Sequence, residues 1–131
     1  MTAFVDTNIL VRHLTGDPPE MAARATAYLR SETGVLLTDL VAAETVYVLE
    51  SFYETPREQV AQAIWSLIGL NTVICVDSAL LLRAIEVYET DRFDFAEAYL
   101  AACAESTGVG KVASFDRSLD RVSTVERIEP R

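Results

Sequence analysis

The stretch "AFVDTNIL", Ala3 to Leu10, contains the pattern on which the fold is built. Its first three residues are apolar and predict a buried strand, and Ile9 and Leu10 resume the apolar pattern soon afterwards. Asp6 lies where this strand should end and a helix should begin. Because ligands bind beyond the carboxyl ends of the strands in parallel α/β folds, Asp6 lies at the expected position for a site.

Strand-like and helix-like segments alternate along the rest of the chain. Apolar runs at 34–38, 72–76 and 111–114 predict three more strands, and 124–128 predicts a fifth at an edge. Continuous apolar strands separated by helices are typical of a mostly parallel sheet covered on both faces. We therefore expect one α/β domain over residues 1–131. Its expected form is three-layer α/β/α with a four- to five-stranded sheet, and its ligands should bind at the carboxyl ends of the strands.

Composition and charge limit the kinds of partner that the protein is expected to bind. The chain has 131 residues, and 20 acidic against 11 basic residues give a net charge of −9. This balance argues against broad electrostatic binding of nucleic acid. It favours metal cations or a basic protein partner, although charge alone is better explained by an acidic surface that keeps the protein soluble. With no long apolar span and no signal-peptide pattern, we expect a cytoplasmic protein. Cys75 and Cys103 are expected to be free thiols, and the sequence leaves a disulfide between them open.

Two further acids, Asp116 and Glu44, lie at a predicted strand end and on a predicted helix. Each is a candidate site residue that also has an ordinary structural explanation. Asp116, in "KVASFDRSLD", follows the fourth strand as Asp6 follows the first, and aspartate is also common in turns. Glu44, in "LVAAETVYVLESFY", lies at the margin of an apolar helix face. It is either a site residue or a boundary residue with its carboxylate in water. Asp39 is the expected N-cap of that helix.

The segment "DFAEAYLAACAES", Asp94 to Ser106, is small or apolar on nearly every side and predicts a buried helix. Glu97 is surrounded there by alanines. A buried carboxylate requires either a compensating cation or a raised pKa. Asp94 precedes Glu97 by three residues, so it either faces the same region or caps the helix.

Together these acids suggest a metal site. We expect Asp6, Glu44, Glu97 and Asp116 to converge at one end of the sheet, with Asp94 as a further ligand. Clustered carboxylates cannot all remain ionised without cations. Oxygen ligands suit Mg²⁺ or Mn²⁺ rather than zinc, and the one histidine, His13, has no obvious partner. Such cations commonly serve phosphate chemistry.

Four motifs occur in order along nearly the whole chain: "FVDTNILVRHL", "LLTDLVAAETVYVL", "DFAEAYLAACA" and "VASFDRSLDRV". In their order and spacing the chain resembles the PIN-domain ribonucleases, specifically the VapC-type toxins of type II toxin–antitoxin systems. The resemblance implies a three-layer α/β fold. It also implies an Mg²⁺- or Mn²⁺-dependent endoribonuclease that hydrolyses RNA with a metal-activated water.

The resemblance also implies residue roles and partners. Asp6, Glu44, Glu97 and Asp116 would hold the metal and orient the water. Thr7 and Asn8 would support the first acid, Ser114 would support the last, and Arg117 would contact RNA phosphate. The implied partners are a cognate VapB-like antitoxin, the RNA substrate and a second copy in a homodimer, with no membrane. The family usually has Asp where this chain has Glu97, whose carboxylate is one methylene further out.

Two alternatives remain. In the first, the protein is an aspartyl-phosphate phosphatase with Asp6 as nucleophile. Such enzymes usually carry a second Asp two residues later, where this chain has Asn8. In the second, it is a degenerate PIN domain that binds antitoxin or RNA without cleavage. Metal-dependent cleavage that is lost on Asp6→Asn substitution distinguishes the nuclease from this binding module.

Overall fold

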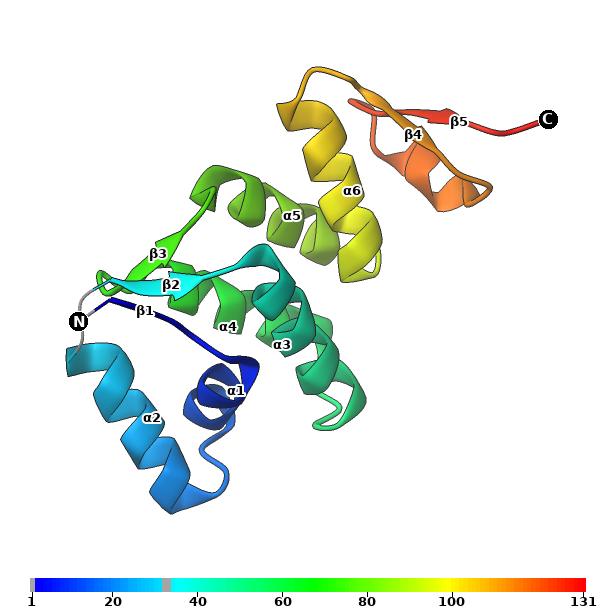
Figure 1. Cartoon of the computed structure of the whole chain (residues 1–131). Coiled ribbons are helices and arrows are strands. Elements are labelled where there is room, and N and C mark those ends of the chain that lie inside the picture. Colours follow the sequence, from blue (N-terminus) through cyan, green and yellow to red (C-terminus); the bar gives the residue numbers. More distant parts are fainter. Residues whose placement is uncertain (1, 32–33) are drawn as a thin grey trace. The chain divides into compact units, whose positions relative to one another are not determined.

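A computed structural model describes residues 2–31 and 34–131 (Figure 1). The chain divides into two compact units, unit 1 over residues 1–78 and unit 2 over residues 79–131, and each is described by itself. Among the described residues, no helix has the length and apolar character needed to cross a membrane. Both cysteines are free thiols, as expected.

Unit 1 contains a parallel three-stranded sheet in the order β1-β2-β3. Ala3 pairs with Val35, and Val35 pairs with Val73, so the strands run in register and their carboxyl ends share one edge. Asp6 follows β1 at that edge. The elements of unit 1 are β1 (Ala3–Phe4), α1 (Thr7–Thr15), α2 (Pro19–Ser31), β2 (Val35–Leu37), α3 (Asp39–Ser51), α4 (Arg57–Ile68) and β3 (Val73–Cys75).

Helix packing builds the core of unit 1. α1 packs against both α2 and α3, α3 packs against α4, and α4 packs against β3 (Figure 1). Leu10, Leu29, Val35 and Ile64 are almost completely buried in this core. Burying each such side chain stabilises the fold by about 1.5–3 kcal/mol relative to leaving it exposed. The packing therefore fixes α1, and with it the turn that carries Asp6.

Local capping sets where the helices of unit 1 begin. Asp6 is the N-cap of α1, and Gly16, with a φ of 72°, ends it in the left-handed conformation that glycine adopts without strain. The prediction that Asp39 caps α3 is wrong. Thr38 is the N-cap, and its Oγ1 accepts a hydrogen bond of 3.1 Å from the Val41 N–H. The extended backbone of Thr38 aims its hydroxyl at that N–H, and Asp39 is instead the first helical residue.

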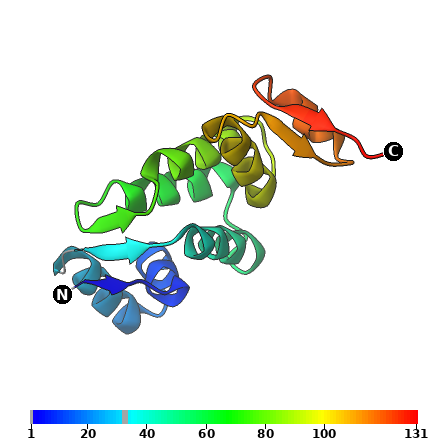
Figure 2. The same ribbon diagram turned by 45° about the horizontal axis from the view of Figure 1, so that its top comes forward.

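Unit 2 contains two helices and a second, two-stranded parallel sheet among the described residues. Figure 2 shows β4 and β5 side by side, and the short 3₁₀ helix in the connection between them packs against β5. α5 and α6 contact each other through the Tyr88 and Phe95 rings, whose centroids are 6.2 Å apart. The elements are α5 (Ser78–Thr90), α6 (Phe95–Ser106), β4 (Lys111–Ala113), the 3₁₀ helix (Arg117–Arg121) and β5 (Glu126–Ile128).

The α/β class and the parallel strand pairing agree with the sequence prediction. The described strands form one sheet of three in unit 1 and one of two in unit 2, where one sheet of four to five strands was expected. α6 is buried along the face that carries Ala98, Ala101 and Ala102. The expectation of a buried helix thus holds for one face only, because Ala96 and Leu100 are exposed.

Candidate functional site

Two acids predicted from separate motifs meet in unit 2. Asp116 follows β4 and caps the 3₁₀ helix, where its Oδ1 accepts a hydrogen bond of 2.9 Å from the Ser118 N–H. The Asp116 N–H donates to Ser114 Oγ at 2.9 Å, which fixes the turn. Glu97 lies in the first turn of α6, and its side chain is hydrogen-bonded to that of Asp116. Two carboxyl groups are therefore held in direct contact.

The contact shifts the two pKa values in opposite directions. The hydrogen bond to Asp116 is the main cause that raises the pKa of Glu97 to about 7, and desolvation and the Asp94 charge add to it. The same hydrogen bond, with those from Ser118, lowers the pKa of Asp116 to about 2. Near neutral pH the pair shares one proton, which Glu97 donates to the Asp116 carboxylate. A cation can take the place of that proton.

Asp94 lies beside this pair as the N-cap of α6. Its side chain accepts a hydrogen bond of 2.8 Å from the Glu97 N–H. This is the capping role that the sequence left open. Its charge also contributes to the raised pKa of Glu97, so it lies within electrostatic reach of the pair. A role for Asp94 as a metal ligand stays a prediction.

The "DTN" residues lie at the start of α1 in unit 1. Asp6 is exposed, and its Oδ1 accepts a hydrogen bond of 2.9 Å from the Thr7 N–H. Thr7 is buried, and its Oγ1 has no hydrogen-bond partner among the described residues. Asn8 follows in the first turn and is exposed. Because a buried hydroxyl without a partner is unfavourable, Thr7 Oγ1 fits a water or an ion next to Asp6.

Glu44 is exposed on α3. The buried face of this helix is formed by Ala42, Thr45, Val46 and Leu49. This face does not extend to Phe52, which follows the helix and is 74% exposed. Glu44 therefore lies outside the buried face, with its carboxylate available to a ligand in solvent.

The structure brings Glu97 and Asp116 together in unit 2, and it describes Asp6 and Glu44 within unit 1. Among residues 2–31 and 34–131, no group of three or more acidic, histidine or cysteine side chains is arranged to hold a metal ion. Convergence of all the predicted acids thus stays a prediction. His13 hydrogen-bonds Thr26 at 2.8 Å, and burial and the Arg30 charge lower the pKa of this histidine.

Sequence reasoning missed two residues next to Asp116. Ser118 donates its N–H to Asp116, and its Oγ lies 3.5 Å from Glu97 Oε2. The charge of Arg121 helps to lower the pKa of Asp116, and its guanidinium lies 4.7 Å from the Phe93 ring centroid. A serine two residues after an aspartate at a strand end signals such a turn. Arg117, the predicted phosphate contact, is exposed.

Comparison with known proteins assigns the chain to a family. The sequence profile of the PIN domain family matches residues 3–125, which include every predicted acid. The comparison with curated proteins found no match. A match over this much of the chain confirms the PIN domain that the four motifs predicted, and the VapC-type subtype stays a prediction. The chain therefore belongs to the PIN domain family, whose members are generally nucleases.

Proposed function

We propose that this protein is an Mg²⁺- or Mn²⁺-dependent endoribonuclease that hydrolyses RNA phosphodiester bonds. The observation that carries the proposal is the contact between Glu97 and Asp116, two carboxyl groups that share a proton near neutral pH. Such a pair offers oxygen ligands to a hard cation, which would relieve the repulsion between two ionised groups. Membership of a family of nucleases supports the same chemistry.

The proposed metal ligands are Asp6, Glu44, Glu97 and Asp116, with Asp94 as a further candidate. The donor set fits Mg²⁺ or Mn²⁺ because every proposed ligand is a carboxylate. The orphaned Thr7 Oγ1 fits a water held next to Asp6. When bound, the ion would polarise the phosphodiester and lower the pKa of the attacking water.

The chain's own residues prepare the carboxylates for this role. The hydrogen bond from the Thr7 N–H fixes one oxygen of Asp6. The Ser118 N–H and Ser114 Oγ fix Asp116 and its turn, and Asp116 remains ionised at neutral pH because its pKa is about 2. Because its pKa is about 7, the Glu97 carboxyl is partly protonated at neutral pH in the metal-free protein, and a bound cation would favour its ionised form.

The finer biological assignment is part of the proposal. We propose a single three-layer domain in a cytoplasmic toxin that forms homodimers and pairs with a VapB-like antitoxin. The net charge of −9 supports docking of an antitoxin segment that carries a basic side chain. Expressing the chain alone and with its genomic neighbour tests this pairing. Growth arrest that the neighbour relieves, together with co-purification, is expected.

The nuclease proposal is tested by cleavage of total cellular RNA with Mg²⁺, with Mn²⁺ and with EDTA. We expect cleavage with either metal, products with 5′-phosphate and 3′-hydroxyl ends, and no cleavage in EDTA. Asp6→Asn and Asp116→Asn should abolish cleavage, whereas Asp91→Asn, a matched charge change between α5 and α6, should not. If well-folded protein cleaves no RNA with either metal, the degenerate, non-cleaving PIN domain is the correct interpretation.

A further inference from the structure

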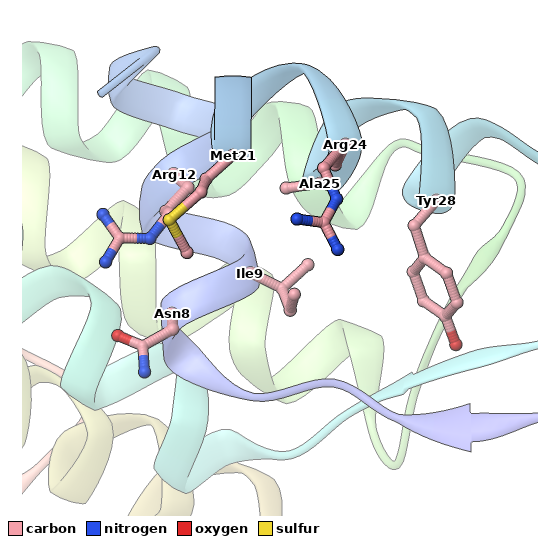
Figure 3. A pocket seen from close by; sticks show the side chains of 7 residues that line it. All are labelled: Asn8, Ile9, Arg12, Met21, Arg24, Ala25 and Tyr28. Atoms are coloured by element: carbon pink, nitrogen blue, oxygen red, sulfur yellow. The ribbon is translucent and has the colours of Figure 1, made fainter. Parts of the chain in front are cut away.

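A pocket of about 340 Å³ opens between α1 and α2 of unit 1 (Figure 3). Asn8 and Ile9 line it from α1, and Arg24 and Tyr28 line it from α2. In Figure 3 the Arg24 guanidinium reaches toward Ile9, with the Tyr28 ring at one end of the pocket and Asn8 at the other. The volume is at the lower end of the range for small-molecule sites, about 300–1,000 Å³.

The charge of the pocket is opposite to that of the protein. Its lining contains Arg12 and Arg24 and no acidic residue, although the chain has 20 acidic and 11 basic residues. Neither arginine forms an ion pair with the residues that the structure describes. Arg12 donates to the Asp17 carbonyl at 3.1 Å, and its Nε is buried without a partner among these residues. The pocket therefore presents the Arg24 guanidinium, which suits a phosphate, whereas the Arg12 guanidinium points away from it in Figure 3.

The remaining lining suits a flat apolar group. Ile9, Met21 and Ala25 supply aliphatic and thioether surface, and Tyr28 adds an aromatic ring. Met21 is 46% exposed, so this surface is open to a ligand. Bases of single-stranded RNA stack on aromatic rings, whereas bases inside a duplex are not free to do so. A guanidinium next to an aromatic ring thus matches one phosphate and one unpaired base.

We propose that this pocket binds one nucleotide of the single-stranded RNA substrate. Arg24 contacts its phosphate, and its base packs on Tyr28. The assignment to RNA rests on the proposed function, and it is supported by Asn8, which extends the pocket to the turn that Asp6 caps. An acidic peptide would use Arg24 but would leave the aromatic and apolar lining unmatched. RNA uses both parts of the pocket.

The test measures binding of a short fluorescein-labelled single-stranded RNA to the full chain by fluorescence anisotropy. EDTA is present, and a denaturing gel checks that the strand is intact. Arg24→Gln should weaken binding about tenfold, as expected for loss of a charged contact to phosphate. It should also reduce the slope of log K against log salt by about 0.7. Arg30→Gln is the matched control, because Arg30 is exposed on the same helix and does not line the pocket.

Tyr28 gives an independent measurement. Tyr28→Ala should weaken RNA binding about tenfold, and Tyr28→Phe should restore it, because stacking requires the ring and not the hydroxyl. A duplex of the same sequence should bind more weakly and should not respond to Tyr28→Ala. Thermal melts establish that each variant is folded. Equal affinities of Arg24→Gln and Arg30→Gln for RNA, or no loss with Tyr28→Ala, overturn the proposal.

Poly-glutamate tests the acidic peptide. If poly-glutamate binds with dependence on Arg24 while RNA binding does not depend on this residue, the pocket is a peptide site and the proposal is wrong.

Cleavage assays separate this proposal from the nuclease proposal. In an active enzyme, Arg24→Gln should raise KM about tenfold and leave kcat nearly unchanged.

The two proposals can fail separately. If no metal supports cleavage but Arg24 and Tyr28 still control RNA binding, the pocket assignment stands and the nuclease proposal fails. If cleavage occurs and Arg24→Gln matches Arg30→Gln in binding, KM and kcat, the pocket assignment fails and the nuclease proposal stands.

Discussion

The Glu97 carboxyl is hydrogen-bonded to Asp116, and this one contact raises the pKa of Glu97 while it lowers that of Asp116. The two residues come from the first turn of α6 and the turn after β4. Two carboxyl groups in contact are stable when a proton or a cation lies between them. The pair is therefore the feature of unit 2 whose state should depend most on pH and on divalent metal.

In metal-free protein, the stability of the Glu97→Gln variant relative to wild type should increase as pH rises. Because the pKa of Glu97 is raised to about 7, its stabilising proton is fully present below the ordinary value of 4.5 and is lost as pH rises through about 7. The glutamine amide can donate to Asp116 at every pH. Urea unfolding in EDTA should show that Glu97→Gln gains stability relative to wild type between about pH 5 and pH 8.5. An unchanged difference would contradict a shared proton.

Divalent metal should stabilise the protein through Asp116. A ligand at 100 times its Kd adds about 2.7 kcal/mol, which raises Tm by several degrees for a chain of this size. Melting with and without Mn²⁺ should show this rise for wild type and for the control Asp91→Asn. It should be lost in Asp116→Asn. If Asp116→Asn retains the full rise, Asp116 does not bind the metal.

Asp6 has two separable tasks, because it caps α1 and is a proposed metal ligand. Asn caps helices about as well as Asp, so Asp6→Asn should melt like wild type, and Asp6→Ala should lose about 1 kcal/mol. Both variants should lose RNA cleavage by at least about 100-fold, since even residues behind metal ligands contribute 10- to 100-fold. If Asp6→Asn cleaves RNA at the wild-type rate, Asp6 only caps α1 and is not a metal ligand.

The sequence predicted elements best where local signals agree. The helix expected in the segment Asp94 to Ser106 is α6 (Phe95–Ser106), because an N-cap aspartate precedes an alanine-rich run and a Thr-Gly pair follows it. The strand expected over 72–76 is shorter, since pairing with β2 ends at Cys75 and leaves Val76 exposed. Thr38 and Asp39 are both good capping residues, so only the backbone conformation decides between them.

The candidate site was predictable in its residue types and less so in its contacts. Acids after strands marked Asp6 and Asp116, because strand ends are where α/β folds place ligands. The half-buried state of Glu97 depends on the approach of the 3₁₀ helix, and its contact with Ser118 spans 21 residues of sequence. No local pattern encodes such a contact. The pocket between α1 and α2 was missed for the same reason, because Arg24 and Asn8 line one pocket only after folding.

The ion pair between Arg83 and Glu105 should stabilise unit 2 in a pH-dependent way. Arg83 donates from Nε and Nη2 to the two oxygens of Glu105 at 2.8 and 2.9 Å, and Glu105 also accepts from Thr124. Glu105→Gln should therefore cost about 1–2 kcal/mol near pH 7, measured by urea unfolding. The control Glu86→Gln should cost less, because Glu86 pairs with the same arginine but its side chain is 53% exposed. The hydrogen bond from Arg83 is the main cause that lowers the pKa of Glu105 below its ordinary value of 4.5. The ion pair therefore stabilises the fold above pH 4.5, and this stabilisation is lost as pH falls through the lower pKa of the folded state. The penalty of Glu105→Gln should thus shrink as the solution is acidified, and a penalty that is constant with pH would show that packing, rather than charge, holds α5 against α6.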